Sequence, residues 1–98
     1  MFGLSDILQE KLCSVFRKYN CIDEVVIYGS RALGTNRENS DIDITLKGTI
    51  PFDKLLNIEI EIDDLMLPYK VDLSVYNAIQ NKELIEHINR VGKIFFRK

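Results

Sequence analysis

Apolar and polar residues follow two different periods along this chain, and the change from one period to the other marks the expected helices and strands. Between residues 5 and 19 the apolar side chains recur every three or four positions, which predicts an amphipathic helix. Ser5 suits its N-cap and Asp6 its first turn. The segment EVVIY at 24–28 then predicts a strand, and its four consecutive apolar residues indicate that both faces are covered. A short turn or helical segment is expected at 30–34.

A second predicted strand carries acidic and apolar residues on opposite faces. After a loop at 35–40, residues 41–47 read DIDITLK and alternate strictly. Asp41, Asp43 and Thr45 therefore share one face, and the apolar residues between them point to the core.

The segment 51–66 fits both periods, because NIEIEID alternates as a strand does while the apolar residues keep a helical spacing. Those apolar residues are Phe52, Leu55, Ile58, Ile62 and Leu65, with Glu59 as an alternative to Ile58. Pro51 suits the first position of a helix, and the segment is long for a strand, so we predict a helix.

The remaining segments complete the order of elements. Residues 69–75 predict a third strand, residues 78–89 a third helix, and the C-terminal KIFFRK a short strand or an ordered tail. The order α-β-α-β-α-β-α predicts a single α+β domain over residues 1–98, in which helices pack on a small mixed β-sheet.

The composition narrows the class of partner. The 98 residues carry a net charge of −2, whereas proteins that grip nucleic acid usually have a basic excess, so no nucleic-acid partner is expected. Cys13 and Cys21 match no CxxC or zinc pattern and are expected as reduced thiols. We see no leader segment and no apolar run of membrane-spanning length, so a cytoplasmic protein without membrane contact is expected.

Three aspartates are the candidate metal ligands. Asp41 and Asp43 lie on one strand face, about 6–7 Å apart by the rise of a strand. Two carboxylates so close repel each other unless a cation joins them, and oxygen ligands without histidine or cysteine favour Mg²⁺ or Mn²⁺. Asp72 lies between apolar residues of the third strand, where an acid is costly without a partner. If the second and third strands are neighbours, the three acids can hold two metal ions.

The Gly29-Ser30 pair is the candidate phosphate-binding turn. Glycine at the end of a strand lets an anion approach the backbone closely, and the start of a helical segment presents free N–H groups to it. Ser30 adds a hydroxyl donor. A phosphate-binding turn next to metal-binding acids is typical of a site for a metal-bound nucleoside triphosphate.

The stretch GSRALGTNRENSDIDI resembles the GS-x10-DxD signature of the DNA polymerase β-like nucleotidyltransferase superfamily. The short chain is similar to the minimal nucleotidyltransferase (MNT) branch, and the likeness extends to VDLSVY and to the final helix-then-strand segment. It implies the polymerase β-like nucleotidyltransferase fold. It also implies that Gly29 and Ser30 bind the triphosphate, while Arg31 matches an arginine often found after that pair and is expected to contact a phosphate.

The same resemblance implies the roles of the acids and the reaction. Asp41 and Asp43 would bind both Mg²⁺ ions, and Asp72 would bind the catalytic ion and help activate the acceptor hydroxyl. ATP is the expected donor, and AMP the group transferred. MNT proteins are commonly the antitoxins of toxin–antitoxin pairs with a helical HEPN protein and can AMPylate a HEPN tyrosine, so a HEPN-type partner is expected, in a homo- or hetero-oligomer.

Three other functions fit the same residues. One is a small-molecule nucleotidyltransferase of the aminoglycoside-modifying type, which needs an acceptor pocket that a chain this short hardly supplies. Another is a non-catalytic antitoxin subunit that binds nucleotide and acts by occluding its partner. The last is a structural domain stabilised by calcium.

Other conspicuous residues have plainer interpretations. His87 is expected as a surface or boundary histidine. Four acids of the segment 51–66 would spread over different helix faces and form a solvated surface: Glu59, Glu61, Asp63 and Asp64. Three aromatic residues belong either to an interface or to the core: Tyr76, Phe95 and Phe96.

Overall fold

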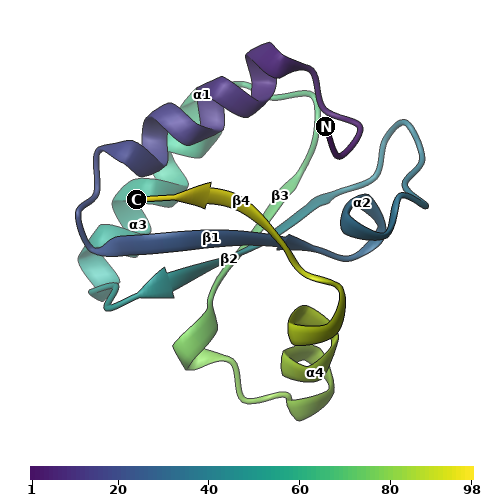
Figure 1. Cartoon of the computed structure of the whole chain (residues 1–98). Helices are drawn as coiled ribbons and strands as arrows, with labels where there is room; N and C mark the ends of the chain where they lie inside the picture. The colour runs from purple at the N-terminus through teal and green to yellow at the C-terminus, as the bar shows by residue number, and fades with distance from the viewer.

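The computed structural model describes residues 1–98 and contains four α-helices, one 3-10 helix and four strands (Figure 1). In chain order these are α1 (Asp6–Arg17), β1 (Ile22–Tyr28), α2 (Ser30–Leu33), β2 (Ile42–Gly48), α3 (Phe52–Asp64), β3 (Val71–Val75), η1 (Tyr76–Ala78), α4 (Lys82–Val91) and β4 (Lys93–Arg97). The α+β class is confirmed, and the C-terminal KIFFRK segment forms a paired strand. None of the helices is long and apolar enough to cross a bilayer.

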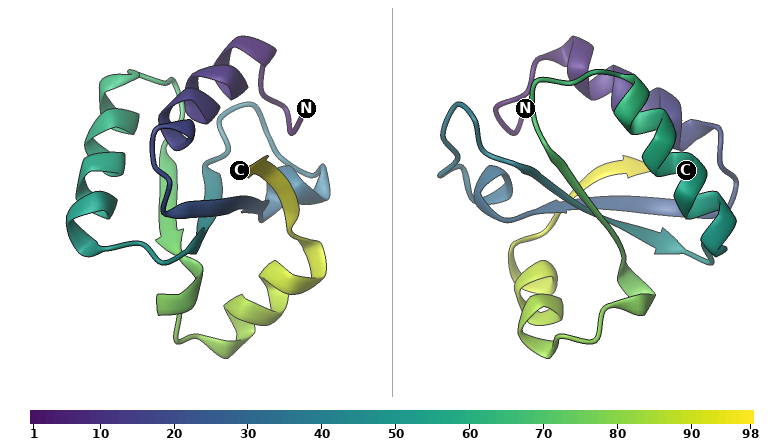
Figure 2. Two further views of the ribbon diagram at one scale, coloured as in Figure 1. Left: turned by 60° about the vertical axis from the view of Figure 1, so that its left-hand side comes forward. Right: turned by 180° about the vertical axis from the view of Figure 1, so that it is seen from behind.

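The strands form one mixed sheet in the order β3-β2-β1-β4. β1 pairs antiparallel with β2 and β4, whereas β2 pairs parallel with β3. A parallel pair needs a crossover connection, and α3 supplies it. Figure 2 shows α1 and α3 over one face of the sheet and α4 over the other. β1 therefore lies between two helical layers, and its residues Val25 to Tyr28 are all buried, as their apolar run predicts.

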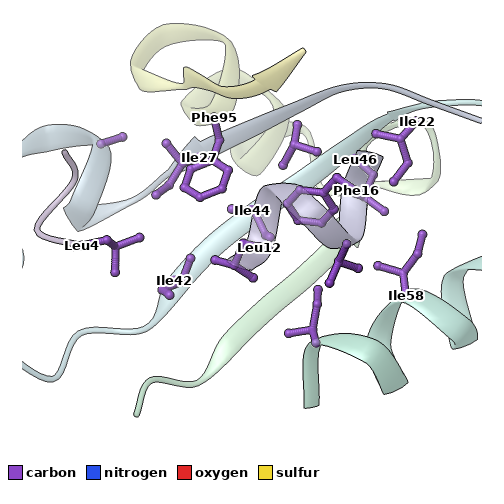
Figure 3. Packing of buried hydrophobic residues seen from close by; sticks show 14 residues of the cluster. Leu4, Leu12, Phe16, Ile22, Ile27, Ile42, Ile44, Leu46, Ile58 and Phe95 are labelled. Atoms are coloured by element: carbon purple, nitrogen blue, oxygen red, sulfur yellow. The ribbon is translucent and has the colours of Figure 1, made fainter. Parts of the chain in front are cut away.

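The main core lies between the sheet and the layer formed by α1 and α3 (Figure 3). Leu12 and Phe16 of α1 and Ile58 of α3 are fully buried there against the inward residues of β1 and β2. Burial of each such side chain contributes about 1.5–3 kcal/mol. On the opposite face a smaller cluster joins Val26 and Tyr28 to Ile88 of α4. The two clusters hold the sheet between its helices and so fix the strand ends that carry the candidate site.

The aromatic residues near the C-terminus belong to these clusters. Phe95 is buried in the main core, and Phe96 packs against it. Tyr76 packs against the smaller cluster and donates a hydrogen bond to Asn89 Oδ1 at 2.8 Å.

A polar contact fastens the end of α1 to α3. The Tyr19 hydroxyl donates to Glu61 Oε2, and Lys18 Nζ lies 2.7 Å from Glu61 Oε1. Burial and the bond to Glu61 raise the pKa of Tyr19 to about 12, while the Lys18 and Tyr19 hydrogen bonds lower the pKa of Glu61. Glu61 is thus engaged in holding two helices together.

The helix starts agree with the sequence-based expectation in one case and differ from it in two. Ser5 caps α1 as predicted, because its Oγ accepts from Leu8 N–H at 3.2 Å. Pro51, however, is the N-cap of α3 and not its first helical residue. The last helix begins at Lys82 instead of residue 78, because the Asn81 side chain caps it by accepting two backbone N–H bonds.

The sequence predicts Phe52 inside, but its side chain is 73% exposed. At 100° per residue it lies roughly 100° around α3 from the centre of the stripe formed by Leu55, Ile58, Ile62 and Leu65. It lines up instead with Leu56 and Ile60, which are also exposed.

Candidate active site

The Gly-Ser turn and the second aspartate of the DxD pair meet at one end of the sheet. Gly29 follows β1 with a positive φ of +73°, a conformation that side chains rarely adopt, and Ser30 begins α2. A Cβ atom placed on Gly29 would lie 2.5 Å from Asp43 Oδ2. Glycine is therefore required here twice, for its backbone angle and for the close approach of the Asp43 carboxylate.

Asp72 lies beside Asp43, because β2 and β3 are neighbours and these two residues are partners in their parallel register. The sequence predicts this proximity only if the two strands are neighbours, and the structure shows that they are. Asp72 is exposed on an edge strand, while its neighbours Val71 and Leu73 pack against the core. Its carboxylate therefore costs less free energy of desolvation than an acid buried inside an apolar strand. Asp41 precedes β2 and is also exposed.

The three acids influence one another electrostatically. The pKa of Asp43, which is half-buried, is raised first by burial and then by the charges of Asp72 and Asp41. His87 and Lys70 act in the opposite direction. The geometry thus gathers negative charge beside the Gly29-Ser30 turn, with Asp43 at its centre.

Comparison with known protein families identifies the family of the chain. The profile "Polymerase beta, Nucleotidyltransferase" matches residues 10–98, which is most of the chain. The chain belongs to this nucleotidyltransferase family. No curated protein is similar enough in sequence to count as a relative.

Three solved structures of the same fold come from toxin–antitoxin complexes. One, a toxin–antitoxin with AMP-PNP, has a TM-score of 0.73 at 19% identity and covers 92% of this chain and 73% of that one. A second contains a tri-AMPylated Shewanella oneidensis HEPN toxin in complex with MNT antitoxin, with a TM-score of 0.68 at 15% identity, covering 97% of this chain and 74% of that one. A mutant of the MntA-HpeT toxin–antitoxin gives 0.70 at 22% identity, covering 97% and 74%. At these identities the likeness shows the fold.

The donor chemistry of the candidate site fits a hard divalent cation. Its acids offer carboxylate oxygens, which Mg²⁺ and Mn²⁺ prefer, and the crowding that raises the pKa of Asp43 is what a cation would relieve. The side chains of this structure do not converge on one point, since no three His, Cys, Asp or Glu groups are placed to hold a metal ion together. Asp41 and Asp72 are exposed and have room to turn towards Asp43.

Arg31 follows the Gly-Ser pair but points into the protein. Its side chain is only 2% exposed, and its Nε and Nη2 atoms donate to the Ser40 carbonyl at 3.2 and 2.8 Å. Nη1 donates to the Phe2 carbonyl at 3.0 Å, and the guanidinium lies 4.5 Å from the centre of the Tyr69 ring. These contacts tie the segment before β2 and the N-terminal segment to α2. They favour a role in positioning the site; a phosphate contact by Arg31 stays a prediction.

His87 contacts the candidate site, although no local pattern in the sequence predicts this. Its Nε2 atom accepts a hydrogen bond from Gly29 N–H at 3.1 Å, and its ring meets the Tyr28 ring edge-to-face with centroids 6.1 Å apart. It is the only histidine of the chain and sits on α4, next to the buried Ile88. Its distance in sequence from Gly29 hides this contact, and the helical period alone predicts only a boundary position.

Proposed function

We propose that this chain is a Mg²⁺-dependent nucleotidyltransferase that transfers AMP from ATP to a hydroxyl group. The observation that carries the proposal is the meeting of Gly29, Asp43 and Asp72 at one end of the sheet, on three elements that the chain brings together from distant positions. A turn suited to phosphates beside acids suited to divalent cations is what a metal-bound nucleoside triphosphate requires.

Each of these residues has a role that follows from its chemistry. The backbone of Gly29 and the hydroxyl of Ser30 donate hydrogen bonds to the triphosphate. Asp41 and Asp43 would hold the two ions, and the Asp72 carboxylate would complete the ligand set and accept the proton of the acceptor hydroxyl. When bound, the two ions lower the pKa of the acceptor hydroxyl and stabilise the charge of the pyrophosphate leaving group.

The reaction is a displacement at the α-phosphorus of ATP. A bond forms between the acceptor oxygen and that phosphorus, while the bond to the bridging oxygen of the β-phosphate breaks and pyrophosphate leaves. The products are an AMPylated acceptor and pyrophosphate.

The proposed acceptor is a tyrosine hydroxyl of a HEPN-type helical protein, to which this chain would be the antitoxin. Support comes from the similar structures, because one contains AMP-PNP and another contains an AMPylated HEPN toxin with its MNT antitoxin. The nucleotide and the AMPylated toxin are properties of those proteins, and the shared fold is our reason for proposing the same reaction for this chain.

The test is an in vitro reaction with Mg²⁺, ATP labelled at the α-phosphate and the purified helical protein encoded by the adjacent gene. We expect label on that protein with the wild-type chain and none with Asp41→Asn, Asp43→Asn. An unlabelled partner that nevertheless binds the chain would contradict the catalytic proposal. A double variant that still neutralises the toxin completely would show that occlusion, not transfer, is the main activity.

A further inference from the structure

We propose that His87 sets the nucleotide affinity of this site, because its imidazole and a phosphate group compete for the same backbone N–H of Gly29. The inference rests on the proposed function and adds to it a residue on α4, an element that carries none of the metal-binding or phosphate-binding groups named so far.

The Gly29 amide and the His87 ring are joined by a hydrogen bond. Gly29 N–H donates to His87 Nε2 at 3.1 Å, which is an ordinary length for such a bond. An imidazole that accepts at Nε2 is neutral and carries its proton on Nδ1. The Gly29 amide therefore already donates to a side chain.

The backbone at His87 is fixed on the sheet, but its side chain is not fully enclosed. The ring meets Tyr28 edge-to-face, and the neighbouring Ile88 is buried against Val26 and Tyr28, so the α4 backbone is fixed on the sheet. The His87 side chain itself is only half-buried, and it bonds the turn whose Gly29 closely approaches the Asp43 carboxylate. It thus lies at the boundary of the acidic site, on a rigid helix but with an open side.

The competition is for the Gly29 amide. A backbone N–H makes one good hydrogen bond, so a phosphate oxygen that reaches the Gly29 amide must replace Nε2. Nucleotide binding then loses the net value of the His87–Gly29 bond. One net hydrogen bond corresponds to roughly a threefold to tenfold change in affinity.

The experiment is calorimetric titration of Mg²⁺–AMP-PNP into the wild-type chain and into His87→Phe. Phenylalanine keeps an aromatic ring against Tyr28 but cannot accept a hydrogen bond, so we expect the variant to bind about three to ten times more tightly. Glu86→Gln is the matched control, because Glu86 lies on the exposed face of α4 and pairs only with Arg90 there. It should bind as the wild type does. Unchanged or weaker binding by His87→Phe would overturn the inference.

A second measurement uses the wild-type protein alone and so does not depend on the variant's folding. In ¹⁵N NMR spectra, saturation with Mg²⁺–AMP-PNP should shift both the Gly29 amide and the His87 Nε2 signals as their bond is exchanged for one to phosphate. A His87 Nε2 signal that stays in place at saturation would refute the competition.

Failure of the inference can be told apart from failure of the proposed function. Nucleotide binding without transfer to any partner removes the proposed function, and the two affinities still decide the role of His87. Nucleotide binding seen only in His87→Phe supports the inference. Absence of binding in both proteins overturns both.

Discussion

Asp43 and Asp72 stand opposite each other in the parallel register of β2 and β3, so two carboxylates of like charge face each other across neighbouring strands. Like charges directly opposite on a sheet are destabilising. The protein therefore keeps a repulsive pair at the point where the Gly29-Ser30 turn approaches the sheet, and this repulsion can be measured.

Asp43→Asn should stabilise the metal-free protein while abolishing nucleotidyl transfer. Removing one charge of the pair is expected to raise the free energy of unfolding by about 0.5–1 kcal/mol, measured by urea denaturation in EDTA. Thr35→Ala in the exposed loop before β2 is a suitable control, with little change in either property. A less stable Asp43→Asn protein would show that the carboxylate is held by favourable contacts instead.

The same repulsion predicts a pH dependence. The pKa of Asp43 is raised in the folded protein above its usual value of 3.8, so the unfolded chain loses this proton first as the pH rises. The contribution of Asp43 to the free energy of unfolding must therefore fall as the pH increases from 3.8 through the raised pKa. Plotted against pH, the free energies of unfolding of the wild type and Asp43→Asn should diverge over this window and run parallel above it.

Gly29→Ala should damage both folding and the site. The alanine Cβ would lie 2.5 Å from Asp43 Oδ2 at a φ of +73°, so the carboxylate has to move. Gly34→Ala separates the two effects, because Gly34 has a similar φ of +78° but no atom within 4 Å of the new Cβ. Gly34→Ala should lose about 1–2 kcal/mol to strain in the left-handed region, as followed by thermal denaturation. Gly29→Ala should lose more, because its ψ of −154° places it in a region that almost only glycine adopts, and only this variant should also lose affinity for Mg²⁺–AMP-PNP. Equal nucleotide affinity in both variants would contradict this account.

Arg31→Lys should lower the free energy of unfolding by about 3 kcal/mol, although the charge is kept. A lysine ammonium cannot reproduce the fork that bonds the carbonyls of Ser40 and Phe2 together, and it would be buried without all its partners. Arg37→Lys in the exposed loop should change it by less than about 0.5 kcal/mol. If Arg31→Lys is as stable as the wild type, the buried guanidinium is dispensable for the fold.

Tyr19→Phe should detach α1 from α3 at one point and cost about 1 kcal/mol at neutral pH. Glu61 has a lowered pKa in the folded protein, so its contribution is present above the unfolded value of 4.5 and is lost as the pH falls through the lowered value. The difference between Tyr19→Phe and wild type in urea denaturation should shrink in acid. Glu10→Gln, which breaks the exposed pair with Arg17, should have little effect at any pH.

The sequence was sufficient for the elements and for part of the site. The strict alternation of DIDITLK placed Asp43 on the face away from the core, and the apolar run before Gly29 identified a strand covered on both sides. Both patterns follow from the geometry of a strand and need no knowledge of the rest of the chain. The sequence also motivated Asp72, but its place beside Asp43 depends on strand order, which no local pattern encodes.

What the sequence could not supply depends on long-range packing. Arg31 is buried because its guanidinium bonds the backbone carbonyls of Phe2 and Ser40, which come from two other segments of the chain. Nothing in the sequence at either position predicts this contact. His87 reaches Gly29 because α4 packs on the sheet with one particular rotation. The helical spacing predicts Phe52 inside, but Phe52 lies roughly 100° around α3 from the centre of the apolar stripe and faces solvent.

The parallel pairing of β2 with β3 has a consequence for the order of folding. β1 and β2 pair at short range in the sequence, whereas β3 reaches β2 only after α3 has crossed the sheet and β4 reaches β1 across most of the chain, so both edge strands close loops that are entropically costly. Asp72 therefore reaches Asp43 in a late step, and we expect substitutions in β3 to change the unfolding rate more than the folding rate in stopped-flow experiments. A newly made chain would then bring Asp72 beside Asp43 only after the segment up to β3 had been made and had folded.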